Sequence, residues 1–397
     1  MNVKPILNRF LHNVTPSMHK VRRKAVSACL LSLMHGGAAS VTSIGRNIDS
    51  PAKEKHRIKR ADRLCSNTRL FNELEPIYAS ICSYWLSSIT RPIILIDWSD
   101  LDGSKRNFLI RAAQVLDGRS ITLYQEVHTV DTKEKPATHT IFLTKLKALL
   151  SDNCKPIIVS DAGFKVPWFK LVLALGWDYV GRSRKPNYYQ AKGADWQSID
   201  TLYKTASSKP KSFTGLLTMK NQFPTNFVLY KQRYKGREQL NKQGKKSRIK
   251  TSLHHAKGAK DPWLLVTSLA GYSKLANKVV KIYQYRMQIE EGFRDMKGEH
   301  YGLGFNLSKS KNSQRISILI LLTTLASMLL LIIGNALVAS GLSRRYQANT
   351  IKCRRVLSFQ FVALRAVADK TLELSKQYWQ EAIIKMRLTM LEAAHEI

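Results

Sequence analysis

The most restrictive feature of this sequence is one long uncharged segment. Residues Ile316–Ser343 contain no Lys, Arg, Asp or Glu, and Ile318–Ile333 is almost entirely Ile, Leu, Thr, Ala and Met. By length alone such a helix could span a bilayer. The segment also contains Thr323, Thr324 and Asn335, and no second segment like it exists in the chain. We therefore expect a buried core helix and no association with a membrane, with a single membrane span as the alternative.

The charge balance narrows the class of protein. The 397 residues include 64 Lys and Arg against 28 Asp and Glu, which gives a net charge of +36. This excess is not expected of an enzyme that acts on small metabolites, and it indicates a polyanionic partner. We expect a nucleic acid whose binding depends strongly on salt, because neutralised phosphates release counterions. A basic ribosomal protein or a membrane-surface protein is the alternative.

Cysteine usage indicates the compartment. The cysteines stand singly, and no pair has the spacing of a metal site: Cys29, Cys65, Cys82, Cys154 and Cys353. This set favours a reducing environment over a disulfide framework or a zinc module. The first residues show no charged start followed by an apolar run, so no secretory signal is predicted. We expect a cytoplasmic protein.

Residues 1–88 have the pattern of several short helices. The apolar periodicity of Val21–Met34 predicts a helix that ends at the glycines Gly36 and Gly37. A densely basic helix is predicted after the turn at Pro51, with these cations: Lys53, Lys55, Arg57, Lys59, Arg60 and Arg63. Short helices with tight turns and one basic helix resemble helix-turn-helix DNA binders. A solvated basic helix without a ligand is the alternative.

Residues 92–185 alternate between strand and helix patterns. Predicted strands are Ile93–Ile96, Phe108–Leu116, Ile121–Val127, Pro156–Val159 and Trp177–Val180. Predicted helices are Thr138–Leu150 and Val166–Leu175. A turn with Asp117 and Gly118 predicts a hairpin between the second and third strands. Hairpin strands followed by strands separated by helices indicate a mixed sheet with helical layers.

Residues 186–262 interrupt this pattern. Short strands are predicted at Leu216–Met219 and Phe227–Lys231, and Lys231–Lys260 is predicted as a mobile basic loop. A buried strand then resumes at Trp263–Leu269, and one helix is predicted over residues 274–297. Residues 345–397 are predicted to be helical.

Two acids follow short apolar runs. Asp97 and Asp161 each end a predicted buried strand, and acids at the carboxyl ends of neighbouring strands converge on one crevice. A helix N-cap is the alternative for either residue alone. Asp100 and Asp102 compete for the first position, but they are predicted to lie in the loop that precedes Gly103.

The helix predicted over residues 274–297 supplies a third acid. At about 100° per residue, one stripe of this helix contains four polar side chains: Tyr283, Arg286, Glu290 and Lys297. Three nearby carboxylates would repel one another unless a cation lies among them, and their hard oxygens suit Mg²⁺ or Mn²⁺. Arg286 and Lys297 suit the phosphates of a bound strand. A surface lattice of ion pairs is the alternative for this stripe.

The spacing Tyr-x2-Arg-x3-Glu-x6-Lys resembles the YREK signature of bacterial insertion-sequence transposases with a DDE triad, insertion sequence family four. Further resembling segments cover nearly the whole chain: Gly45–Asn47, Ile94–Asp100, Gly118–Ser120, Thr122–Tyr124, Ile158–Trp168, Pro262–Trp263, Arg286–Glu291, Phe293–Asp295, Tyr301–Gly304 and Gln347–Thr350. The resemblance implies an α/β fold with an RNase H-like mixed-sheet core and a β-rich insertion. It implies helical DNA-end-binding residues 1–88, a core at 89–185 and 263–344, a basic insertion at 186–262, and a helical region at 345–397 that forms a dimer.

The same resemblance assigns roles to particular residues. It implies that Asp97, Asp161 and Glu290 hold two Mg²⁺ ions, with Mn²⁺ as a substitute. It implies that the Tyr, Arg and Lys of the signature grip DNA and that Trp263 receives a flipped base; a simple core position is the alternative for this Trp. The candidate DNA contacts are Tyr283, Arg286, Lys297, Trp263, Arg294, Arg46, Asn47, Arg57, Lys59, Arg60 and Arg63.

The activity implied by the resemblance is cut-and-paste transposition. It comprises end nicking, hairpin formation, hairpin opening and strand transfer. The partners would be double-stranded DNA, as terminal inverted repeats and target, and a second copy of the chain. A metal-dependent nuclease or resolvase on the same core is one alternative, and a non-enzymatic DNA-binding or membrane-anchored protein is another.

Overall fold

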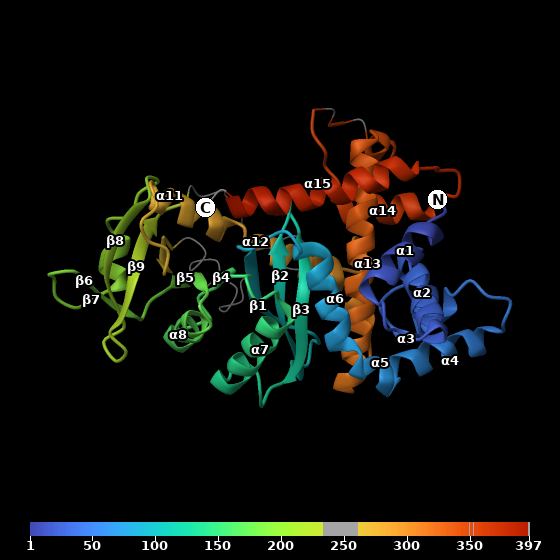
Figure 1. The fold of residues 1–397 in the computed structure, drawn as a ribbon, viewed down its shortest axis with the longest axis horizontal. Coiled ribbons are helices and arrows are strands. Elements are labelled where there is room, and N and C mark those ends of the chain that lie inside the picture. Colours follow the sequence, from blue (N-terminus) through green and yellow to red (C-terminus); the bar gives the residue numbers. More distant parts are fainter. Residues whose placement is uncertain (233–260, 349, 352, 396–397) are drawn as a thin grey trace, which may run out of the picture. The chain divides into compact units, whose positions relative to one another are not determined.

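The computed structural model describes residues 1–232, 261–348, 350–351 and 353–395 (Figure 1). The predicted basic loop Lys231–Lys260 lies almost wholly outside the described residues. The chain forms two compact units. The first contains Met1–Cys154 and Met287–His395, and the second contains Lys155–Arg286. The division into five segments that the sequence suggests stays a prediction.

Helices form the start of the first unit. They are α1 (Lys4–Val14), α2 (Lys20–Met34), α3 (Val41–Arg46), α4 (Glu54–Cys65), α5 (Thr68–Asn72) and α6 (Leu74–Leu86). The predicted helix at Val21–Met34 and the predicted basic helix are both confirmed. Ser40 caps α3 by accepting a hydrogen bond from the Ser43 amide. A Cβ on Gly45 would lie 2.3 Å from Ile58 Cα, so α3 and α4 can pack this closely because Gly45 has no side chain.

Three antiparallel strands follow in the order β3-β2-β1: β1 (Ile93–Asp100), β2 (Asn107–Val115) and β3 (Ser120–Thr129). Helix α7 (Pro136–Leu149) comes next. The apolar run Ile93–Ile96 is buried, as predicted, but the strand does not stop at Asp97. Pairing with β2 continues as far as Asp100. The prediction that Asp97 ends its strand and that Asp100 lies in a loop is wrong, because backbone pairing persists where the apolar run has ended.

The long uncharged segment forms α13 (Ser313–Ala339), the central helix of the first unit. It packs between the N-terminal helices and β3, and it also contacts α14 (Phe359–Ala368) and α15 (Lys376–His395) (Figure 1). A Cβ on Gly334 would lie 2.2 Å from the carbonyl oxygen of Phe359, which explains a glycine in this helix. By length and composition α13 could span a membrane, but 89% of its most apolar stretch is buried inside the protein. The burial agrees with the predicted core helix.

The short 3-10 helices η1 (Phe305–Leu307) and η2 (Leu342–Tyr346) flank α13 in the chain. Beyond them, α14 and α15 confirm the helical prediction for part of residues 345–397, whereas the described residues between η2 and α14 are not helical. The first unit thus contains a three-stranded meander, α12 (Met287–Lys297), and a helical core built around α13.

The second unit contains a mixed sheet. Strand β4 (Ile157–Ser160) is parallel to β5 (Asp178–Ser183), with α8 (Val166–Ala174) as the crossover. Antiparallel strands follow β5 in the order β10 (Trp263–Thr267), β9 (Phe223–Tyr230), β8 (Lys211–Leu217), β6 (Tyr188–Ala191) and β7 (Gln197–Ser198). Helices α9 (Ile199–Tyr203) and α11 (Leu275–Gln284) complete the described part. Parallel and antiparallel pairs together confirm the predicted mixed α/β architecture.

Two local predictions in this region are wrong. The strand predicted at Leu216–Met219 begins at Lys211 and ends at Leu217. The single helix predicted over residues 274–297 is broken into α11 and α12 by a turn at Tyr285 and Arg286. The amides of these two turn residues bond to carbonyls three residues back, at 3.2 and 3.1 Å, which tightens the backbone and ends α11.

Candidate active site

The position of Asp97 within β1 determines which face of the sheet it occupies. Asp97 stands opposite Arg111 of β2 in the antiparallel register. Opposite residues of an antiparallel pair project to the same face, and so do residues two apart on one strand. Asp97, Ser99 and Arg111 therefore share one face of the meander. The amide of Trp98 donates to Asp97 Oδ1 at 2.8 Å, which helps to orient the carboxylate.

Helix α12 covers this same face. The guanidinium carbon of Arg111 lies 4.7 Å from the ring centre of Phe293, and its Nη2 group donates to Met296 Sδ at 3.2 Å. At the end of the helix, Lys297 Nζ donates to Ser99 Oγ at 2.7 Å. At its start, Gln288 Oε1 accepts from the Leu116 amide at 2.9 Å. These contacts fix the rotation of α12 about its axis.

Glu290 lies on the stripe of α12 that also contains Phe293 and Lys297. Phe293 follows it by three residues and Lys297 by seven, which is the spacing of one helical stripe. Since Phe293 and Lys297 contact residues on the Asp97 face, the first unit directs Asp97 and Glu290 into the same layer between strand and helix. Both carboxyl groups are half-buried.

The ammonium group of Lys297 has unusual surroundings. Its Nζ lies 5.9 Å from the centre of the Phe293 ring. The guanidinium carbon of Arg111 lies 4.7 Å from the same ring centre. Burial lowers the pKa of Lys297, and the positive charge of Arg111 lowers it further, while Asp100 opposes the shift. The sequence pattern identified the lysine but gave no indication of Ser99 as its hydrogen-bond partner.

Asp161 belongs to the second unit and directly follows buried strand β4. Its Oδ1 accepts a hydrogen bond from the Gly163 amide at 2.8 Å, so the carboxylate is held in the loop between β4 and α8. The residue at the N-cap of α8 is Lys165. Asp97 lies inside a strand. The N-cap alternative is therefore wrong for both acids.

The other signature residues of the second unit surround Tyr283. This tyrosine is 4% exposed, and its ring lies edge-on to Trp263 at 5.0 Å. The guanidinium carbon of Arg286 is 5.9 Å from the same ring. Tyr283 lies at the end of α11 and Arg286 lies in the turn after it, so the single helical stripe predicted for the four signature residues is wrong. Of the four, Glu290 and Lys297 remain on one helix.

Electrostatics identify two further arginines near Tyr283. Burial raises the pKa of Tyr283, whereas Arg286, Arg182 and Arg184 lower it and Asp161 raises it. Arg182 is buried, and its Nη2 group donates to the carbonyl oxygens of residues 261 and 262 at 3.2 Å each. The sequence analysis missed both Arg182, which lies in β5, and Arg184, which directly follows that strand. Their spacing of two residues, which suits two cations on one face of an extended segment, was the available signal.

Trp263 is half-buried within an aromatic cluster. Besides Tyr283, it contacts Tyr230 on β9, with the ring centres 5.8 Å apart. These contacts are those of a packed core residue. The Trp263 side chain also keeps some exposed surface, and its predicted stacking on a flipped base stays a prediction.

The N-terminal candidates separate into two groups. Arg46 pairs with Glu54 at 2.9 Å, Asn47 donates to the Ser43 carbonyl at 2.9 Å, and Arg57 donates to the Ile48 carbonyl at 2.9 Å. These three side chains form contacts within α3, or between α4 and α3 or the residues that follow α3. The sequence did not predict this structural role. Lys59 is exposed.

Arg60 and Arg63 line an open groove of about 640 Å³ between α2 and α4. The groove is lined by no acidic residue among the described ones. Its lining adds cations and histidines that the sequence analysis missed: His19, Arg22, Lys24, His56 and Arg69. We call this surface the basic groove.

Arg294 points away from the Asp97 face. Its side chain is 69% exposed, and it bonds to both oxygens of Glu291 at 2.7 and 2.9 Å. The next residue, Asp295, turns inward and pairs with Arg119 at 2.6 Å. The predicted DNA contact of Arg294 stays a prediction.

The donor set can be compared with what a divalent metal requires. Asp97 and Glu290 present half-buried carboxylate oxygens in one layer of the first unit, and hard oxygens of this kind suit Mg²⁺. Within the described ranges, no group of three or more His, Cys, Asp or Glu side chains is placed to hold one metal ion. Asp97 and Glu290 are thus two hard-oxygen donors of the first unit, and Asp161 is a carboxylate of the second unit.

Comparison with known protein families shows to which family the chain belongs. A family model described as the transposase DDE domain matches residues 89–329, more than half of the 397 residues. The chain therefore belongs to the transposases with a DDE domain. Members of this family act on DNA and use divalent metal ions. A comparison with curated proteins finds no match.

Proposed function

We propose that this protein is a cut-and-paste DNA transposase of the YREK-signature group, insertion sequence family four, similar to the transposase of transposon ten. The observation that carries the proposal is the packing of α12 on the strand face that holds Asp97, because Glu290 lies on the same helical stripe as Phe293 and Lys297. The family match over residues 89–329 supports it. We infer that the core is RNase H-like, with residues 186–262 as the insertion.

Asp97, Asp161 and Glu290 are proposed to hold two Mg²⁺ ions, for which Mn²⁺ can substitute. Such ions polarise a phosphodiester and stabilise the attacking and leaving oxygens. The protein's own contribution is rigidity. Asp97 is fixed by strand pairing and by the Trp98 amide, and Glu290 by the contacts that orient α12. Asp161 is restrained by its bond to the Gly163 amide.

The cations of the signature are proposed to grip the DNA. Lys297 is held by Ser99 two residues beyond Asp97 on the same face, so its ammonium group suits a phosphate next to the scissile one. Arg286 and the Tyr283 hydroxyl would bind the same strand, with Trp263 stacking on an extruded base. The field of Arg182 and Arg184 at Tyr283 supports a phosphate-binding surface in the second unit.

The basic groove is proposed to bind the terminal inverted repeats of the element. Its cations and its lack of a described acidic lining residue suit the DNA backbone. Target DNA is the second nucleic-acid partner, and a second copy of the chain completes a paired-end complex. Because the substrate is chromosomal DNA, we infer a cytoplasmic, nucleoid-associated location.

A cleavage assay tests the proposal. A labelled duplex that carries the element's own terminus is incubated with the full chain and Mg²⁺, and nicked, hairpin and joined products are separated. Glu290→Gln is expected to lose product by about 10²-fold or more, because it removes a charged metal ligand. Glu291→Gln is the matched control, since Glu291 bonds to Arg294 instead.

Each result has a distinct reading. Nicks and hairpins that disappear in Glu290→Gln but persist in Glu291→Gln support the transposase. Cuts without hairpin or joined products favour the metal-dependent nuclease or resolvase. DNA binding without any metal-dependent cleavage contradicts the proposed function.

A further inference from the structure

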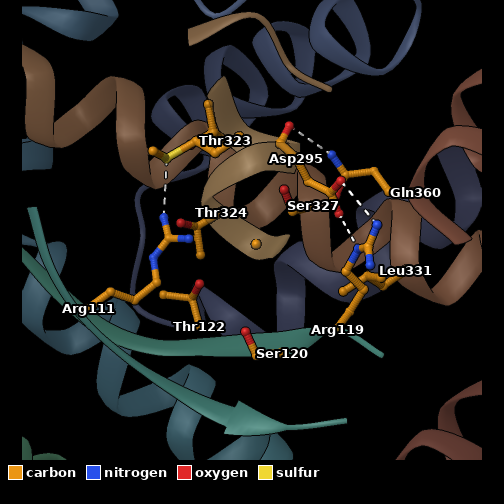
Figure 2. Close-up of a pocket in the computed structure, with 12 residues that line it drawn as sticks. Arg111, Arg119, Ser120, Thr122, Asp295, Thr323, Thr324, Ser327, Leu331 and Gln360 are labelled. Atoms are coloured by element: carbon orange, nitrogen blue, oxygen red, sulfur yellow. Dashed lines mark hydrogen bonds and ion pairs between the residues drawn. The ribbon is translucent and has the colours of Figure 1, made fainter. Parts of the chain in front are cut away.

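A small polar cavity lies behind the candidate active site, wholly within the first unit. It has a volume of about 20 Å³ and lies between α12, α13, α14 and the strands β2 and β3 (Figure 2). Polar side chains form most of its wall: Arg111, Arg119, Ser120, Thr122, Asp295, Thr323, Thr324, Ser327 and Gln360. A cavity of this size has room for one water-sized particle.

Arg111 brings a buried positive charge to this cavity. The residue is 4% exposed, and burial lowers its pKa to about 10. Its described hydrogen-bond partners are neutral: Nε donates to Gln125 Oε1 at 2.9 Å, and Nη2 donates to Met296 Sδ at 3.2 Å. Phe293 covers one side of the guanidinium. The Nη1 group has no hydrogen-bond partner in the described part of the chain.

The other two charged side chains at the cavity, Arg119 and Asp295, form an ion pair in which their charges cancel. Arg119 Nε donates to Asp295 Oδ2 at 2.6 Å, and Arg119 Nη2 reaches Asp295 Oδ1 at 3.4 Å. In Figure 2 this pair lies on the opposite side of the cavity from Arg111. Among the cavity-lining side chains, Arg111 therefore has no ion-pair partner, and burying a charged group is costly unless hydrogen bonds or an opposite charge compensate it.

The neutral lining is rich in donors. Thr324 Oγ1 accepts a hydrogen bond from Gln125 Nε2 at 2.6 Å, so its own proton can be donated elsewhere. Within the described residues, the hydroxyls of Thr122 and Ser327 have no hydrogen-bond partner. Three hydroxyls and one guanidinium nitrogen can thus donate into a single small space, and donors around a positive charge select an anion.

We propose that this cavity is a binding site for one chloride-sized inorganic anion, held by Arg111 Nη1 and the surrounding hydroxyls. Phosphate and sulfate are too large for a space of about 20 Å³. The bound anion neutralises Arg111 and links β2 and β3 to α13 across the cavity. The proposal rests on contacts within the first unit and requires neither DNA nor a divalent metal ion.

Thermal unfolding of the full chain tests the site. Sodium chloride replaces sodium methanesulfonate stepwise at constant ionic strength, since methanesulfonate is too large to enter. The unfolding temperature of the wild type is expected to rise with chloride and then to saturate, by about 2–4 °C. Bromide is expected to act in the same way.

Two variants separate a bound anion from a general salt effect. A Cβ on Gly292 would lie 3.5 Å from Ser120 Oγ and 3.7 Å from Arg111 Nη1, so Gly292→Ala fills the space without a clash. Thr122→Val keeps the volume and removes one donor. Both variants are expected to lose the saturable chloride response while they remain folded. An equal response in the wild type and Gly292→Ala overturns the proposal.

A crystal grown in bromide gives the direct answer. An anomalous peak within the cavity, next to Arg111 Nη1, is the expected result. Electron density in the cavity that refines as a water molecule and has no anomalous signal contradicts the proposal, because water would then fill the cavity.

Discussion

Lys297 Nζ donates a hydrogen bond to Ser99 Oγ at 2.7 Å, and this bond ties the last turn of α12 to the strand that carries Asp97. Ser99 shares a sheet face with Asp97, and Lys297 shares a helix face with Glu290. One hydrogen bond therefore fixes the position of a cation relative to both carboxylates. Ser99 acts on the proposed reaction through the position of Lys297.

The first prediction concerns this bond. Ser99 accepts a hydrogen bond that favours the charged form of Lys297, so Ser99→Ala should lower an already depressed lysine pKa further. DNA cleavage by the variant is expected to decline at a lower pH on the alkaline side than in the wild type. Ser99→Thr keeps the hydroxyl and should restore the wild-type profile. Identical alkaline limbs in Ser99→Ala and the wild type would show that Ser99 does not tune Lys297.

The second prediction concerns the ion pair of Arg119 with Asp295. The two side chains are 18% and 9% exposed, and Arg119→Met would leave a buried carboxylate without its cation. We expect a loss of about 3–5 kcal/mol in the free energy of unfolding, measured by urea titration. Arg294→Met is the control. It removes an arginine side chain that is 69% exposed and should cost less than about 1 kcal/mol. Equal losses in both variants would contradict the structural account.

The third prediction compares arginines of the same helix. Arg60 and Arg63 line the basic groove, whereas Arg57 bonds to a backbone carbonyl of residue 48. Arg60→Gln and Arg63→Gln should each weaken binding to end DNA and reduce the slope of log K against log salt by about one. Arg57→Gln should reduce thermal stability instead. Binding and salt slope that stay unchanged in both groove variants would exclude the groove as a phosphate-binding surface.

The fourth prediction concerns stability at low pH. Burial raises the pKa of Glu126, but hydrogen bonds from His128, Lys145 and Tyr124 outweigh burial and lower the pKa to about 2. A carboxyl group with a lowered folded-state pKa stabilises the fold above its unfolded pKa, and this contribution is lost as the pH falls towards 2. Stability measured by urea titration should fall between about pH 5 and pH 2. Glu126→Gln should show a smaller fall over this range, and an undiminished fall would disprove the assignment.

Much of the fold follows from patterns that the sequence displays. The uncharged run at Ile316–Ser343 predicts the core helix, and short apolar runs predict the strands around Asp97 and Asp161. Burial leaves a strong compositional signal because apolar side chains must be removed from water. The continuation of β1 beyond Ile96 depends on backbone pairing with β2, which side-chain composition does not encode.

The break between α11 and α12 shows a second limit. The apolar and polar periodicity of Tyr283–Lys297 is compatible with one helix, and no Gly or Pro marks a stop at Tyr285. Tertiary anchors define the two halves instead, with Tyr283 packed on Trp263 and Gln288 bonded to the Leu116 amide. Long-range contacts of this kind have no local signal, so the hydrogen bond of Ser99 to Lys297 was also missed.

The proposed function makes one central claim, that Asp97 and Glu290 of the first unit and Asp161 of the second bind the same metal ions. The most direct measurement is Mn²⁺ binding, followed by electron paramagnetic resonance, with the full chain bound to an uncleaved end duplex. Asp97→Asn, Asp161→Asn and Glu290→Gln are each expected to weaken Mn²⁺ binding, whereas the control variant Asp100→Asn should bind as the wild type does. Wild-type Mn²⁺ affinity in Asp161→Asn would contradict the account, because the second unit would then contribute no ligand.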